Sequence, residues 1–159
     1  MYRTLTHTLS GAIVALMLTP LAAHAGEAVS LNSAVFVEDV GTDAAGQQRR
    51  VLKAADRLGQ GDRLVFVMKY RNDGSAPVRN FALTNPVPRG VRIDPAHGDM
   101  QVSVDGGRSW GRLTDMIVRT PLGGTRRATP DDVTHVRWTV DTPVAPGASG
   151  QIAWRGTVR

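Results

Sequence analysis

Cysteine is absent from this 159-residue sequence, and aromatic residues are scarce, with three Trp, two Tyr and three Phe. The lack of cysteine excludes disulfide bonds, thiol chemistry and a lipidated N-terminal cysteine, so packing alone must hold the fold. Basic residues interleaved with aromatic ones, which are typical of nucleic-acid-binding surfaces, are also missing. No stretch has a convincing helical period, and no glycine-rich phosphate-binding loop occurs.

The longest apolar run lies near the N-terminus, from about Leu9 to Leu21, and follows the basic residue Arg3. Ala23-His24-Ala25 then matches the small-residue pattern of a signal-peptidase site. The run is shorter than the roughly 20 residues that a membrane span needs. We therefore expect residues 1–25 to be a cleaved signal peptide and the mature chain to be exported, either to the periplasm or to the extracellular cell surface. An uncleaved anchor is the alternative.

Removal of residues 1–25 would leave 134 residues, which is the size of one domain with a substantial core. The mature chain would carry 18 cationic and 14 acidic side chains, a net charge of +4. Only two of the cations, Lys53 and Lys69, are lysines. An arginine-rich surface can meet anionic polymers or lipid headgroups, whereas a compositional bias toward arginine explains scattered arginines equally well. Export would also keep the chain away from nucleic acid.

Apolar residues alternate with polar ones through most of the mature region, which indicates half-buried strands. Short turns rich in Gly, Pro, Asn and Asp separate these runs, and the spacing is typical of a β-sandwich. We expect the segment from Thr120 to Asp132, which is polar and lacks alternation, to be a loop. The expected strands are Leu31–Val37, Arg50–Lys53, Arg63–Arg71, Phe81–Leu83, Met100–Val104, Val136–Asp141 and Gln151–Arg159.

These alternating residues identify the expected core. Its members are Leu64, Phe66, Met68, Tyr70, Phe81, Leu83, Val102, Val104, Val136, Trp138, Val140, Ile152 and Trp154.

Several short motifs occur in one order along the second part of the chain. They are Gly61-Asp62-Arg63-Leu64-Val65-Phe66, Tyr70-Arg71-Asn72-Asp73-Gly74, Asn80-Phe81-Ala82-Leu83, Pro86-Val87-Pro88-Arg89-Gly90-Val91, Val136-Arg137-Trp138-Thr139-Val140, Pro146-Gly147-Ala148-Ser149-Gly150 and Ile152-Ala153-Trp154. In this order they resemble the bacterial conserved-repeat domain of unknown function, number eleven of that series, over roughly 100 of the 159 residues.

That family consists of immunoglobulin-like modules of secreted and cell-surface proteins. The resemblance implies a single domain over residues 26–159, an all-β, immunoglobulin-like Greek-key sandwich of about seven to nine strands. It also implies that Asn72 bonds to the loop backbone and that Gly74 adopts the left-handed conformation. The family usually occurs as tandem copies, so one copy without a wall-sorting signal favours a small soluble exported protein.

The stretch Ser103-Val104-Asp105-Gly106-Gly107-Arg108-Ser109-Trp110 fits the Asp-box pattern of secreted β-proteins. Its aspartate can accept backbone N–H groups across a turn, its glycines allow positive φ, and its tryptophan can cover the hairpin. We interpret it as a folding element.

Two groups of acidic residues are candidates for a functional site. Asp94, His97 and Asp99 could supply metal ligands, although a single histidine in a turn is usually solvated. Asp131 and Asp132 could pair with Asp115 or Asp141 for glycoside hydrolysis, which needs one acid with a raised pKa inside a cleft. We expect neither, and the sequence predicts no enzyme, metal or cofactor.

The remaining candidate is a cationic sheet surface for an anionic ligand. If the strands at Val136–Asp141 and Gln151–Arg159 pair as a terminal hairpin, their arginines share one face, and the basic residues of Arg63–Arg71 extend it. The candidate residues are Arg63, Lys69, Arg71, Arg137, Arg155 and Arg159.

The sequence therefore favours a non-catalytic exported module with a structural, adhesive or protein-interaction role in the cell envelope, whose partner is an envelope or surface protein. The edge of the C-terminal strand could accept another strand. The alternative is a module that binds carbohydrate or an anionic envelope polymer through the arginine-rich face.

Overall fold

The computed structural model describes residues 28–94 and 99–159. The expected signal peptide at 1–25 and the candidate ligand His97 lie outside the described residues. Within the described part the chain is all-β with antiparallel sheets, as the sequence predicts, and it also contains two short 3-10 helices that the sequence did not predict. No helix in this part is long and apolar enough to cross a membrane.

Ten strands form two main sheets and a separate hairpin in the described part. The larger sheet has the order β2-β1-β3-β10-β5, the smaller one has the order β4-β9-β6, and β7 pairs with β8. The bounds are β1 Val29–Thr42, β2 Gln48–Ala54, β3 Arg63–Asn72, β4 Phe81–Pro86, β5 Val91–Ile93, β6 Gln101–Ser103, η2 Leu113–Asp115, β7 Ile117–Arg119, β8 Thr125–Arg127, η3 Pro130–Asp132, β9 His135–Val140 and β10 Ser149–Val158.

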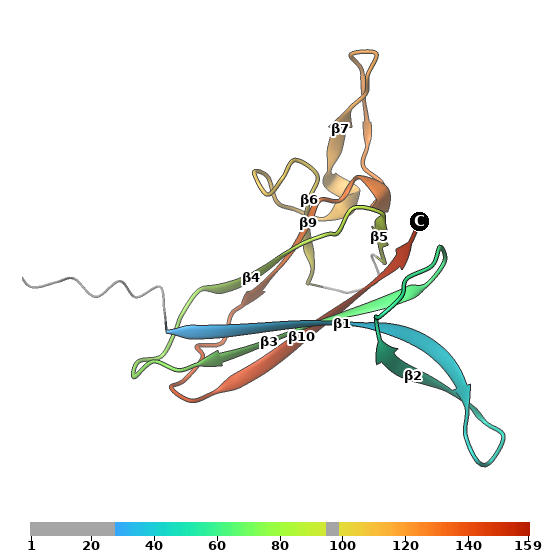
Figure 1. Cartoon of the computed structure of the whole chain (residues 1–159). Helices are drawn as coiled ribbons and strands as arrows, with labels where there is room; N and C mark the ends of the chain where they lie inside the picture. The colour runs from blue at the N-terminus through green and yellow to red at the C-terminus, as the bar shows by residue number, and fades with distance from the viewer. Residues whose placement is uncertain (1–27, 95–98) are drawn as a thin grey trace, which may run out of the picture.

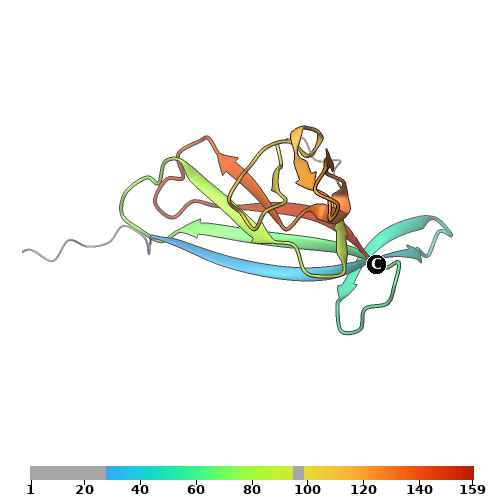
Figure 2. The same cartoon turned by 90° about the horizontal axis from the view of Figure 1, so that it is seen from above.

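The two main sheets pack face to face as the layers of a sandwich (Figures 1 and 2). Their facing residues form one core, in which Phe66 of β3 stacks on Trp154 of β10 with ring centroids 3.9 Å apart. All thirteen expected core residues are buried or pack against the buried cluster. The sequence did not identify four further members, Val91, Ile93, Met100 and Val133.

The prediction that β9 and β10 pair as a terminal hairpin is wrong. β9 lies between β4 and β6 in the smaller sheet, whereas β10 lies between β3 and β5 in the larger one. The chain changes sheet between these two strands, as it also does between β3 and β4, in keeping with the expected Greek-key connections. The Pro-Gly turn between β9 and β10 therefore joins the two layers.

Two hairpins project from the sandwich (Figure 1). The C-terminal half of β1 and β2 form one, and every residue of β2 is exposed. β7 and β8 form the other, and β8 lies within the segment Thr120–Asp132 that was expected to be a loop. Their three-residue strands are too short to show a period, which is why the sequence did not reveal them.

The loop after β3 is built around the buried Asn72. Its side-chain amide donates to the carbonyl oxygens of Ala76 and Val144, both at 2.8 Å, and its oxygen accepts the Gly74 N–H at 2.9 Å. The expected loop-bonding role of Asn72 is confirmed. Gly74 does not have positive φ, so that expectation is wrong. A Cβ there would lie 2.8 Å from that of Ala28, which makes close approach the reason for glycine.

Candidate binding surfaces

Four of the six predicted cationic residues lie on the outer face of the larger sheet, which faces away from the smaller sheet. Arg63, Lys69 and Arg71 alternate with the core residues of β3, and Arg155 of β10 lies opposite Val65 in the register. These side chains therefore share one face, as the sequence predicts for Arg63, Lys69 and Arg71.

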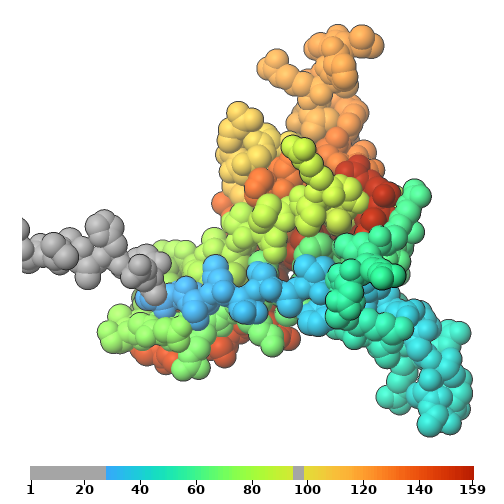
Figure 3. All heavy atoms as spheres, viewed as in Figure 1, coloured from blue at the N-terminus to red at the C-terminus, as the bar shows by residue number. Residues whose placement is uncertain are grey.

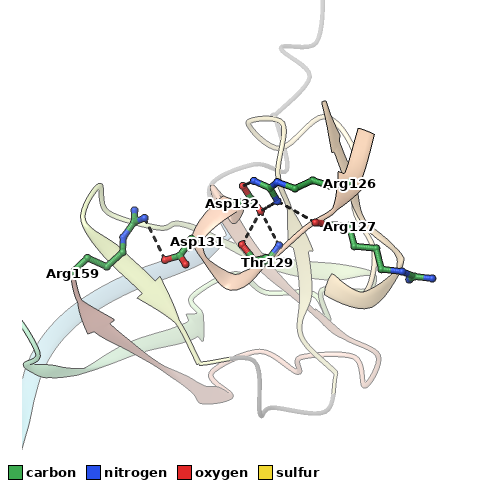
Figure 4. A network of polar contacts seen from close by, with 6 residues as sticks. All are labelled: Arg126, Arg127, Thr129, Asp131, Asp132 and Arg159. Atoms are coloured by element: carbon green, nitrogen blue, oxygen red, sulfur yellow. Dashed lines mark hydrogen bonds and ion pairs between the residues drawn. The ribbon is translucent and has the colours of Figure 1, made fainter. Parts of the chain in front are cut away.

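The other two predicted cations lie elsewhere. Arg137 is on β9 in the smaller sheet, where its guanidinium covers the Trp110 ring at 4.4 Å and contacts the side-chain oxygen of Gln101. Arg159 follows β10 and forms an ion pair with Asp131 at 3.3 Å (Figure 4). Because Arg137 belongs to the smaller sheet and Arg159 pairs with Asp131 beyond the end of β10, the six residues do not form one surface.

A buried carboxylate, which the sequence did not single out, organises one end of the outer face. The Glu38 side chain is only 5% exposed, and its oxygens lie 3.3 Å from Nε of Arg155 and 3.4 Å from Nε of Arg63. Arg50 of β2 lies at 3.8 Å. One acid thus connects four strands, and three arginines around it leave a local excess of positive charge.

The other end of the outer face holds an open depression of about 570 Å³, in which Leu31, Tyr70 and Gly150 lie at the middle positions and polar residues lie on either side of them. Arg71 lies between Ser30 of β1 and Ser149 of β10 in the strand register, and Lys69 lies between Asn32 and Gln151. Both cations and their four neighbours are exposed. Hydrogen bonding by Ser30 and then by Arg71 lowers the pKa of the adjacent Asp73 carboxyl. We call these six residues, Ser30, Asn32, Lys69, Arg71, Ser149 and Gln151, the outer polar depression.

An apolar groove of about 330 Å³ lies on the opposite face of β1. It runs between the N-terminal half of β1 and β4, which are neighbours on the face seen in Figure 3. Leu31 and Val35 of β1 line it and are 61% and 38% exposed. Phe66, Met68 and Leu83 from the core also reach it. We call this feature the β1–β4 groove.

Two free strand edges border the β1–β4 groove. In the described part, β2 pairs with β1 only from Phe36 onward, so residues 29–35 have a sheet neighbour on one side alone. β4 likewise pairs only with β9 among the described strands. Backbone N–H and C=O groups at such edges can pair with another extended segment.

The Asp-box folds as a compact loop, as expected. The Asp105 carboxylate accepts the backbone N–H groups of Arg108 and Ser109 at 3.0 and 2.9 Å and the Ser109 hydroxyl at 2.7 Å. These bonds, those from Ser109 foremost, hold the pKa of Asp105 far below its usual value. Both glycines of the motif have positive φ, and the neighbouring Val102 pairs with Gly111 across the loop.

The acidic pair next to the β7–β8 hairpin has a structural role. Asp132 receives two guanidinium bonds from Arg126 at 2.6 and 2.8 Å and closes a capping box with Thr129 (Figure 4). The Arg126 guanidinium lowers the pKa of Asp132, whereas a general acid needs a raised pKa. The described residues contain no group of three or more His, Asp or Glu side chains placed to hold a metal ion.

The sequence did not single out the polar neighbours of the two cations, because these residues come together only in the folded sheet. Ser30, Asn32, Ser149 and Gln151 carry no motif, and only the register places them beside Lys69 and Arg71. One signal was available: Glu38 directly follows the apolar run Ala34-Val35-Phe36-Val37 of the same strand.

Comparisons with known proteins give no further guide to these surfaces. No protein-family model, curated protein or solved structure matches the chain. The resemblance to the conserved-repeat domain therefore stays a prediction.

Proposed function

We propose that this protein is a non-catalytic, exported, immunoglobulin-like module of the cell envelope that binds a partner protein by accepting an extended segment beside β1. The observation that carries this proposal is the coincidence of a free strand edge, residues 29–35, with the apolar β1–β4 groove. The expected signal peptide supports the assignment to the envelope.

The geometry suits strand addition. β2 occupies this side of β1 only beyond Val35, so an added strand of about seven residues would continue the line of β2 and extend the larger sheet. Main-chain hydrogen bonds would supply affinity, and alternate side chains of the partner would enter the groove beside Leu31 and Val35 and supply specificity.

The edge also lacks the features that prevent unwanted pairing. Residues 29–35 read Val-Ser-Leu-Asn-Ser-Ala-Val and contain neither a charged residue nor proline. Proteins commonly protect free edges with such residues, because an unprotected apolar edge promotes association. The unprotected edge and the exposed Leu31 beside it therefore support the proposal that a partner covers this surface.

A pair of photocrosslinking positions tests the proposal in the native cell. One crosslinker replaces Leu31 in the groove, and the control replaces Val40, which is 59% exposed on the projecting part of the same strand. We expect Leu31 to capture one short partner segment with alternating apolar residues, and Val40 not to capture it. A synthetic peptide of that segment should slow amide exchange of residues 29–35.

Charge substitutions at the same two positions supply the functional control. Leu31→Lys should abolish binding of the peptide, because it places a charge in the groove, whereas Val40→Lys should leave binding unchanged. Equal capture at both positions, or a bound peptide that protects no amide in residues 29–35, would contradict strand addition.

A further inference from the structure

We propose that the outer polar depression is a second binding site, which takes a carboxylate-bearing polysaccharide through Lys69 and Arg71. It lies on the face of β1 opposite the β1–β4 groove, so it is independent of strand addition. Four strand positions that carry no recognisable motif complete it, and only the sheet register brings them together.

The arrangement of donors and acceptors is regular. Arg71 has a hydroxyl on each side, from Ser30 and Ser149, and Lys69 has an amide on each side, from Asn32 and Gln151. Neighbouring strands lie about 4.8 Å apart, and the two rows are about 7 Å apart along the strands. Three strands therefore present an array of polar side chains around the two cations. The Ser30 hydroxyl already bonds to Asp73, whereas Asn32, Ser149 and Gln151 can both donate and accept hydrogen bonds.

The charge of the depression selects an anion. Asp73 accepts a hydrogen bond from Nε of Arg71 at 2.8 Å, which fixes the guanidinium while its two terminal nitrogens stay outside that bond. Lys69 forms no ion pair with any residue that the structure describes. Further along the outer face, the arginines around Glu38 carry additional positive charge.

The neighbouring side chains favour a saccharide among the anions. A carboxylate-bearing polysaccharide presents hydroxyl groups beside each carboxylate, and these match the serine hydroxyls and the two amides that flank the cations. Leu31 and Tyr70 also line the depression, but their side chains point to the opposite face, where Leu31 lines the β1–β4 groove and Tyr70 contacts Phe81. The six side chains on the outer face are all polar, so they offer neither an anchor for lipid insertion nor a platform for base stacking. Its open shape admits an extended chain.

Binding of polygalacturonate to the protein tests the proposal, with the methyl-esterified polymer as the uncharged comparison. We expect the acidic polymer to bind, with an affinity that falls as salt is added, and the esterified polymer not to bind. Lys69→Gln with Arg71→Gln should lower the affinity roughly tenfold or more, because charged hydrogen bonds are lost. The matched control, Arg89→Gln with Arg119→Gln, removes the same charge from exposed residues elsewhere and should change it less than about twofold.

A neutral double variant separates recognition from charge. Asn32→Ala with Gln151→Ala leaves the net charge unchanged and should still weaken binding of polygalacturonate several-fold. All substituted residues are exposed, and an unchanged melting temperature checks the fold. Equal losses in the two charge variants would indicate diffuse electrostatic attraction and overturn the proposal. So would absence of binding, or binding only to vesicles of anionic phospholipid.

Discussion

Trp154 is the side chain on which the packing between the two sheets depends most. It is completely buried and stacks on Phe66 with an interplanar angle of 5°. Trp154→Ala should lower the free energy of unfolding by about 3–5 kcal/mol, because it leaves a large cavity between the sheets. Chemical denaturation measures the loss.

A second substitution at this position refines the expectation. The indole Nε1 of Trp154 has no hydrogen-bond partner within the described part of the chain. Trp154→Phe keeps an aromatic ring and removes this unpaired polar group, so it should destabilise less than Trp154→Ala. Leu58→Ala, at a residue that is 51% exposed, is the control and should change stability little. A Trp154→Ala variant as stable as Leu58→Ala would contradict the expected contribution of Trp154 to the core.

Asp105 should make stability depend on pH. Its pKa is lowered in the folded protein by the bonds from Ser109, so the ionised carboxylate stabilises the fold above the ordinary pKa of about 3.9. This contribution falls as the pH drops below that value. Near neutral pH, Asp105→Asn should therefore have a lower melting temperature than the wild type. On acidification, the melting temperature of the variant should fall less than that of the wild type.

The matched control for this titration is Asp56→Asn. Asp56 is an exposed aspartate in the loop before β3, outside the Asp-box. Melting curves of the three proteins between pH 7 and pH 3 separate the contribution of Asp105 from the general effect of acid. The Asp-box does not brace the fold if Asp105→Asn and the wild type lose equal stability on acidification.

Among the elements, β3 could be predicted almost completely and β1 only in part. β3 alternates through Leu64, Phe66 and Met68, and all three are buried against the smaller sheet. β1 extends from Val29 to Thr42, beyond the expected Leu31–Val37, because its C-terminal half leaves the core and pairs with β2. Alternation of apolar and polar residues reflects the burial of one face of a strand, so it cannot show where a strand continues outside the sandwich.

Strand order limited the prediction of the candidate surfaces. Arg63, Lys69 and Arg71 share one strand, so period 2 was sufficient to place them on one face. Arg137 and Arg155 belong to strands whose pairing depends on long-range packing, and the sequence cannot distinguish a hairpin from a connection between sheets. Free strand edges are even harder to predict from the sequence, because an edge is defined by the absence of a neighbouring strand.

Glu38 should fix the projecting β1–β2 hairpin to the rest of the sheet. Its carboxylate contacts arginines of β2, β3 and β10 and is almost fully buried. Glu38→Gln should reduce the free energy of unfolding by about 1–3 kcal/mol, because the charged hydrogen bond from Arg155 is weakened and the ion pairs with Arg63 and Arg50 are lost. It should also speed amide exchange in β2, where strand pairing would loosen.

The adjacent Asp39 provides the control for Glu38. It pairs with Lys53 at 2.6 Å, but its side chain is 49% exposed, so Asp39→Asn should have little effect on stability. Hydrogen exchange followed by mass spectrometry compares the two variants over residues 48–54. Equal exchange in both would show that Glu38 does not hold the hairpin.

At the scale of the whole molecule, both proposed binding sites depend on the two faces of β1. Leu31 and Val35 line the groove toward the smaller sheet, whereas Ser30 and Asn32 belong to the outer polar depression. A strand that is free along one edge can take part in both, because successive side chains point to opposite faces. One module could thus hold a protein segment and a polysaccharide chain at the same time.

We expect binding of the partner in the groove to require cleavage of the expected signal peptide. Ala25 lies only four positions before Val29, where the free edge begins, so an uncleaved chain would tether an apolar run beside the groove and compete with the partner. We expect the protein purified after export to begin at Gly26, as intact mass will show. Ala25→Asp should block processing and weaken binding of the partner peptide, whereas His24→Asp, at the variable position of the site, should be processed. An exported wild-type chain that retains residues 1–25 and still binds the peptide would contradict this order of events.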